Sequence, residues 1–122
     1  MSNAINWFEI PATNMKRAVK FYDEVLGAEL QPLERDGMKW AFFPASDNGV
    51  GGAVVDRNDS NKPNAQGTLV YLNGGDDIAV PLSRVEKAGG KILLPKTSIA
   101  PNGFKAVILD TEGNRVALHS MN

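Results

Sequence analysis

The chain has 122 residues, of which 43% are hydrophobic and 22% charged, and its 13 basic residues nearly balance 14 acidic ones. This length suits one compact domain, and without a basic stripe nucleic acid is not an expected partner. No apolar run approaches the roughly 18 residues of a membrane span, and the absence of cysteine excludes disulfides, thiolate catalysis and cysteine-based metal sites. We therefore expect a cytoplasmic protein that binds neither nucleic acid nor membrane.

The first 27 residues predict a strand followed by a helix. Residues 5–10, INWFEI, are mostly aromatic and β-branched and end at Pro11, which is typical of a strand. Apolar residues then recur between positions 15 and 26 at the spacing of one helical face. Thr13 or Asn14 is expected to cap the start of this helix, and Gly27 to end it.

Three further strands are expected before the middle of the chain. Asp36-Gly37 lies between two short extended runs, which is the strongest hairpin signal in the sequence. The run VGGAVV at 50–55 predicts the next strand, and its paired glycines indicate a bend. Residues 57–67 contain no large apolar side chain and are expected to form a polar linker.

The second half repeats the order of the first. A strand at 68–73 precedes a helix that Asp77 caps and Gly89-Gly90 ends, and the runs KILLPKTS, FKAVILD and RVALHS predict three more strands. When the chain is shifted so that Gly27 falls on Gly90, the expected caps of both helices also coincide. The sequence therefore predicts one domain, residues 1–122, made of two modules at about 5–56 and 68–121.

Three short motifs carry a resemblance to a known family. They are AVKFY with a following LG in the first helix, AGG at the end of the second helix, and DTEGN at 110–114 before the last strand. In this order and spacing the chain resembles the vicinal oxygen chelate superfamily of glyoxalases, bleomycin resistance proteins and extradiol dioxygenases. The resemblance implies an α+β fold in which two βαβββ modules form an open, cupped eight-stranded mixed sheet. It also implies two helices on the convex side, a site in the concave side and a homodimer.

Metal-using members of this family place His or Glu ligands at four matched positions. In this chain those positions fall on Trp7, Val70, Ala117 and a residue within 51–54, where no His or Glu occurs. Because a divalent ion needs several converging ligands, we expect no metal cofactor. A slip of two residues in the first and last strands would bring in Glu9 and His119, so a metal-dependent lyase or dioxygenase remains the alternative.

Glu9 and His119 are the two candidates for catalysis. His119 is the only histidine and shares strand parity with Ala117, so it is either a general acid or base in the cup or a solvated side chain. Glu9 shares parity with Trp7 and is either a base or cation-binding carboxylate, or the partner of a Lys, Arg or His119. If these two side chains act, the protein is a metal-free lyase or isomerase.

An apolar wall is expected on the concave side. Trp7, Trp40 and Phe42 alternate along their strands, and Val70 and Leu72 are expected opposite them. Together with Glu9, Ala117 and His119 they are the candidate ligand-binding residues, although the same aromatic residues also suit a core or a dimer interface. The predicted function is binding of a small organic molecule in an aromatic-lined cup, as in the bleomycin-resistance branch, without chemistry of its own.

Overall fold

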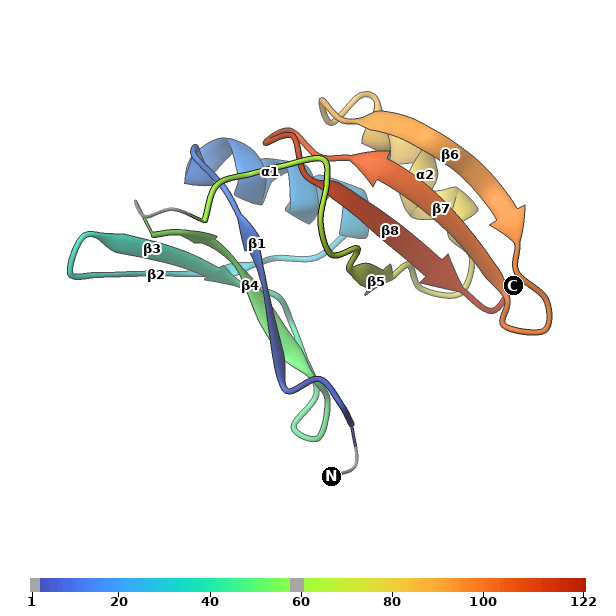
Figure 1. The fold of residues 1–122 in the computed structure, drawn as a ribbon, viewed down its shortest axis with the longest axis horizontal. Coiled ribbons are helices and arrows are strands. Elements are labelled where there is room, and N and C mark those ends of the chain that lie inside the picture. Colours follow the sequence, from blue (N-terminus) through green and yellow to red (C-terminus); the bar gives the residue numbers. More distant parts are fainter. Residues whose placement is uncertain (1–2, 58–60) are drawn as a thin grey trace.

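The computed structural model describes residues 3–57 and 61–122 and contains two βαβββ modules (Figure 1). In chain order the elements are β1 (Trp7–Pro11), α1 (Met15–Leu26), β2 (Gln31–Arg35), β3 (Met38–Phe42), β4 (Gly51–Asp56), β5 (Tyr71–Asn73), α2 (Ala79–Val85), β6 (Lys91–Ser98), β7 (Phe104–Leu109) and β8 (Arg115–Ser120). The predicted α+β class and element order are confirmed. Within the described ranges, neither helix has the length and apolar character needed to cross a bilayer.

The eight strands form two four-stranded mixed sheets. Sheet A has the order β1-β4-β3-β2, and sheet B has the order β5-β8-β7-β6. In each sheet the first strand of the module pairs in parallel with the last, and the other pairs are antiparallel. The expected single eight-stranded sheet is therefore divided in two, because β1 and β5 are edge strands that pair with β4 and β8 but not with each other.

The local signals in the first module explain its helix and hairpin. The Asn14 side chain accepts a hydrogen bond from the backbone amide of Arg17, and Gly27 ends α1 in the left-handed conformation with φ of 62°. Asp36 and Gly37 both have positive φ between β2 and β3. Positive φ at both central residues is the requirement of a type I′ hairpin turn, so the predicted cap, stop and hairpin are all confirmed.

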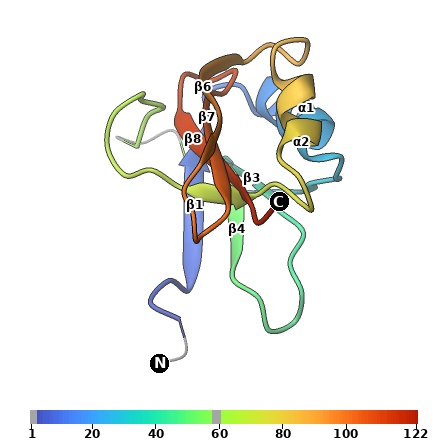
Figure 2. The same cartoon turned by 90° about the vertical axis from the view of Figure 1, so that its right-hand side faces the viewer.

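The two helices lie side by side, as Figure 2 shows. Helix α1 packs against β3 and β4 of sheet A and α2 against β6 of sheet B, and one hydrophobic core joins both modules. Its largest fully buried side chains are Tyr22, Phe21, Ile78, Ile108, Leu118, Val25, Val54, Val85 and Val116. Residues of the sheets that alternate with these core positions point away from the helices. We call the side of each sheet that faces away from the core its outer face.

The paired glycines of β4 provide space for two aromatic rings. Gly51 pairs with Trp7 and Gly52 with Phe8 in the β1–β4 register. A Cβ atom on Gly51 would lie 2.9 Å from the Trp7 ring on the outer face, and one on Gly52 would overlap the Phe8 ring on the core face. Glycine is therefore required at both positions by the close approach of the two rings, and not by the bend that the sequence predicted.

The turn at 110–114 joins the second module to the first through a buried carboxylate. Asp110 is 4% exposed and accepts hydrogen bonds from the Tyr22 hydroxyl at 2.6 Å and from the backbone amides of Glu112 and Asn114. Burial, followed by the charge of Asp110, raises the pKa of Tyr22 well above its usual value. The Asn114 side chain donates to Asp110 and to the carbonyl of Pro11, so the same turn also fixes the end of β1.

Glu112 completes this junction at the start of α1. Its carboxylate accepts hydrogen bonds from the backbone amides of Thr13 and Asn14 and forms an ion pair with Arg17 at 2.6 Å. Burial acts to raise the pKa of Glu112, but the ion pair and the two amide hydrogen bonds lower it more, so the pKa lies below its usual value. The DTEGN motif therefore has a structural role as the connection between the modules.

Candidate functional site

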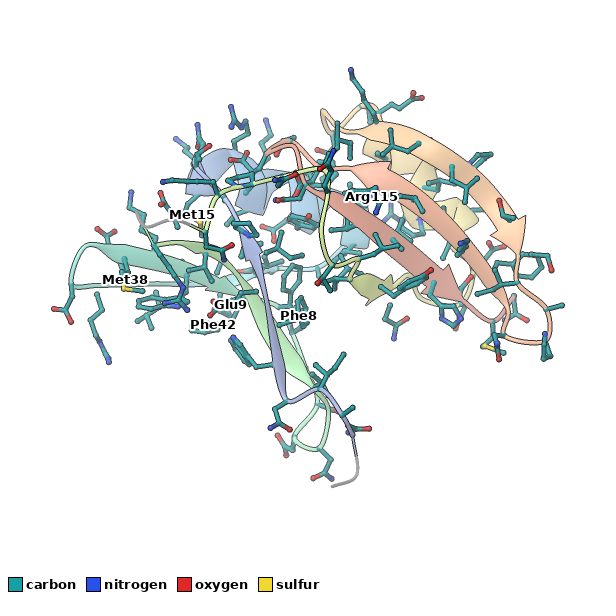
Figure 3. All side chains as sticks on the ribbon, in the orientation of Figure 1. Phe8, Glu9, Met15, Met38, Phe42 and Arg115 are labelled. Atoms are coloured by element: carbon teal, nitrogen blue, oxygen red, sulfur yellow. The ribbon has the colours of Figure 1, made fainter. Side chains whose placement is uncertain are left out.

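The outer face of sheet A carries three aromatic side chains. Trp7, Trp40 and Phe42 alternate with Phe8 and Ala41, which contact the core. The rings of Trp7 and Phe42 meet edge to face, with centroids 6.0 Å apart. Figure 3 shows Glu9 and Phe42 on one side of the β1 ribbon and Phe8 on the other. The expected aromatic surface is present on this side of the sheet.

Glu9 lies on the same face and is held in an ion pair. Arg57 Nη2 donates to both carboxylate oxygens, at 2.6 and 2.7 Å, and Trp7 Nε1 donates to one of them at 3.3 Å. Of the roles expected for Glu9, the pair with a basic residue is the one this geometry matches. Arg57 was missed in the sequence because it directly follows β4 within the predicted linker, and only the strand register brings it beside Glu9.

His119 lies on the outer face of sheet B, in a separate environment. Its Nε2 atom is 2.7 Å from the backbone carbonyl oxygen of Asn102, so Nε2 carries the hydrogen. Glu9 belongs to sheet A and His119 to sheet B, and each has its own partner. In the described part of the chain no hydrogen bond or ion pair joins these two side chains into a dyad.

The orientation of β5 differs from the expected one. Leu72 is 6% exposed and belongs to the core, and Val70 packs against the core. Tyr71 and Asn73 occupy the outer face instead, because they pair with Ala117 and His119 in the parallel register with β8. Val70 and Leu72, which were expected on the concave side opposite the aromatic residues, therefore have the core-side parity of β5.

A groove of about 1360 Å³ opens between the two sheets. Its walls are the first half of β1 with the residues before it, β5 with its flanking residues, the loop after α1, and the first turn of α2. Four large apolar side chains at its edges are strongly exposed, namely Ile5, Trp7, Tyr71 and Val80. Of the residues predicted to bind a ligand, Trp7, Val70 and Leu72 line this groove, whereas Glu9, Trp40, Phe42, Ala117 and His119 do not.

Two smaller hollows contain other candidates. One of about 380 Å³ is lined by His119 and Met121 together with Tyr71, Leu72, Asn73 and Gly75, which also line the groove. The other, of about 350 Å³, lies between α1 and the β2–β3 hairpin and is lined by Trp40. Ala117 is fully buried. The predicted site residues thus lie in several separate places. Of the three predicted aromatic residues, Trp7 lines the groove and Trp40 and Phe42 do not.

The sequence count placed the family's metal positions on Trp7, Val70, Ala117 and a residue within 51–54. Trp7 pairs with Gly51 in sheet A, and the Ala117 amide donates to the Val70 carbonyl in sheet B. None of these four side chains can donate a lone pair to a divalent ion. Among residues 3–57 and 61–122, no three His, Asp or Glu side chains gather as a cation site would require.

Comparisons with known proteins agree with this fold. Residues 4–118 match the family model of the "Glyoxalase/Bleomycin resistance protein/Dioxygenase superfamily". A glyoxylase-like domain-containing protein of Didymella fabae is 32% identical over 123 aligned residues, which cover 93% of this chain and 91% of that protein.

Solved structures extend the comparison at lower identity. A glyoxalase/bleomycin resistance protein from Albidiferax ferrireducens has a TM-score of 0.75 at 12% identity, covering 98% of this chain and all of the other. TnmS3, an antibiotic binding protein from Streptomyces sp. CB03234, has a TM-score of 0.67 at 21% identity, covering 100% of this chain and 99% of the other. With the family match over nearly the whole length, the chain belongs to the glyoxalase, bleomycin resistance protein and dioxygenase superfamily.

Proposed function

We propose that this protein binds a small organic molecule in the groove between its two sheets, beside Trp7, and that it does so without a metal. The observation that carries the proposal is the gathering of exposed Ile5, Trp7, Tyr71 and Val80 around one groove. Exposed apolar side chains are common singly, but a contiguous group of them marks a binding surface.

The size and lining of the groove suit such a ligand. Small-molecule pockets are usually about 300–1,000 Å³ and mostly apolar, with a few polar groups that fix orientation. The groove is larger than this and open to solvent. Its lining is mostly apolar, and its charged residues are Asp76, Asp77 and Arg84, which donates to the Val25 carbonyl at 3.3 Å. The likeness to TnmS3, which is described as an antibiotic binding protein, supports a binding role for this fold.

A binding role is favoured over a lyase or dioxygenase by the state of the candidate catalytic groups. Glu9 is occupied by Arg57 and Trp7, and the Nε2 hydrogen of His119 by a backbone carbonyl. A general base must reach the proton that it abstracts, and neither of these two side chains lines the groove. By the sequence count, the family's metal positions fall on Trp7, Val70 and Ala117, which offer no ligand.

The two tryptophans permit a matched binding test. N-phenyl-1-naphthylamine is a neutral, flat probe whose fluorescence rises in apolar surroundings. We expect it to bind the wild-type protein and the Trp40→Ala variant alike, and the Trp7→Ala variant at least about tenfold more weakly, because aromatic side chains dominate such contacts. Equal affinities of the two variants, or no binding to the wild type, would refute the proposed site.

We further propose that the protein is a homodimer in which the second copy covers the rim of the groove. The outward edges of β1 and β5 pair with no other described strand, and edge strands beside apolar surface are common sites of association. Pairing of β1 in one copy with β5 in the other is self-complementary, as a two-fold axis requires.

Sedimentation velocity at micromolar concentration should therefore report twice the chain mass of 13.1 kDa. Tyr71→Asp, in the groove, is expected to shift the protein towards monomer. Leu93→Asp, at a similarly exposed position of β6 outside the groove, should leave the dimer intact. A monomeric wild type contradicts this proposal.

A further inference from the structure

We infer that the molecule bound in the groove carries an acid group, which is held on the outer face of sheet B by Asn73 and Lys105, on either side of His119. This inference rests on the proposed function, since it describes the ligand of the same groove. It follows from the strand register, from the charges on this face and from the hydrogen-bonding groups that remain unused.

The three side chains form one row across three adjacent strands. Asn73 of β5 pairs with His119 of β8, and His119 pairs with Lys105 of β7. Directly paired residues point to the same side of a sheet, and neighbours such as Leu118 and Ala106 take the core side. All three polar side chains therefore lie on the outer face. Asn73 and His119 line the small hollow, and Lys105 is the strand partner of His119 beside it.

This face is basic and has no acidic side chain in its paired positions. By register the outer face carries Lys91, Arg115 and Lys105 around Leu109, Val107 and Ala117. The ion pairs found among the described residues are Arg17–Glu112, Arg57–Glu9 and Lys96–Asp77. None of them neutralises Lys105. For a chain of net charge −1, a face with only positive charge is complementary to an anion.

Asn73 and Lys105 each retain a donor for an acid group, whereas the Nε2 hydrogen of His119 is already donated to the Asn102 carbonyl. Asn73 Oδ1 accepts from the Gly75 amide at 2.9 Å, which orients the side chain and leaves its Nδ2 hydrogens available. His119 is fixed through Nε2 by the Asn102 carbonyl. Lys105 provides an ammonium group, and hydrogen bonds to ionised oxygens are the stronger kind.

The hollow and the groove adjoin each other along β5. Tyr71, Leu72, Asn73 and Gly75 line both of them. A ligand whose flat apolar body lies against Trp7 and Tyr71 therefore reaches the polar row with a group attached to that body. The ligand class is an apolar or aromatic organic acid.

Two probes that differ by one acid group test this inference. N-phenyl-1-naphthylamine is neutral, and 8-anilinonaphthalene-1-sulfonate has the same rings with a sulfonate added. In the Lys105→Gln variant we expect the affinity for the sulfonate probe to fall about tenfold, as loss of one charged hydrogen bond implies. The affinity for the neutral probe should remain within about twofold of wild type, since apolar burial is unchanged.

Lys91→Gln is the matched control because it removes the same charge from the same face. Lys91 pairs with Leu109, four residues from Lys105 along β7, which is about 13 Å at the usual strand rise. Both probes should bind this variant as they bind wild type. Asn73→Ala provides a second variant, which we expect to lower the affinity for the sulfonate probe but not for the neutral probe.

The outcomes separate the inference from the proposed function. If both probes bind wild type and neither Lys105→Gln nor Asn73→Ala changes their ratio of affinities, the acid-group inference is overturned while groove binding stands. The acid-group inference is also overturned if Lys91→Gln changes the ratio as much as Lys105→Gln. The effect would then come from the loss of any positive charge on this face and not from a contact of Lys105 with the sulfonate. If wild type does not bind the neutral probe, the proposed function itself fails.

Discussion

Replacement of Asp110 with alanine is expected to lower the free energy of unfolding by about 3–5 kcal/mol, as removal of one member of a buried charged network does. The carboxylate is the acceptor for the Tyr22 hydroxyl, the Asn114 side chain and two backbone amides. All of these donors lie at the buried junction of the modules and would lose their acceptor together. Small domains have only about 5–15 kcal/mol of stability, so the variant should be severely destabilised.

Urea unfolding followed by circular dichroism measures this effect, with Tyr22→Phe as the matched control. The control removes the Tyr22 hydrogen bond but leaves Asp110 with its remaining donors, so it should cost only about 1–1.5 kcal/mol. If Asp110→Ala is no more destabilising than Tyr22→Phe, the turn at 110–114 does not hold the modules together as described.

The Gly52→Ala substitution is expected to destabilise the protein by about 1–3 kcal/mol or more, because an added methyl group overpacks a filled core. A Cβ atom at this position overlaps the Phe8 ring, which packs against the core. Relief would require movement of β1 relative to β4, and these strands are paired along their whole length. The aromatic ring thus makes glycine necessary at this position.

Gly51→Ala is the natural comparison because it affects the other face. The neighbouring Trp7 ring is 46% exposed and can move towards solvent, so this change should cost less than about 1 kcal/mol. Thermal or urea unfolding of both variants checks the difference. The double variant Phe8→Leu/Gly52→Ala has a smaller side chain at position 8 and should recover part of the lost free energy of unfolding. If it recovers none, the overlap with the Phe8 ring is not the cause of the destabilisation.

The elements that were predicted correctly are those set by local chemistry. The Asn14 cap, the Gly27 stop and the Asp36-Gly37 turn each depend on a few neighbouring residues, and each forms in the structure. The motifs AVKFY, AGG and DTEGN placed the chain in its family, which the family match confirms. The physical role of DTEGN at the module junction was not visible in the sequence, because its partners lie about ninety residues away.

The features that were missed depend on strand register and on packing between the modules. Leu72 was expected to face the aromatic residues, whereas the register of β5 with β8 gives it core-side parity. Arg57 becomes the partner of Glu9 only through the β1–β4 pairing. The division into two sheets is a matter of which strands pair with one another over each module, which no local pattern specifies.

Binding of a small apolar molecule in the groove beside Trp7 is tested most directly by a titration of the ¹⁵N-labelled protein with N-phenyl-1-naphthylamine. Two-dimensional ¹H–¹⁵N spectra should show the largest shifts at the Trp7 indole and at the amides of residues 70–75. The Trp40 indole and the β2–β3 hairpin should change little. The largest shifts at Trp40, or uniform small shifts throughout the spectrum, would contradict the proposed site.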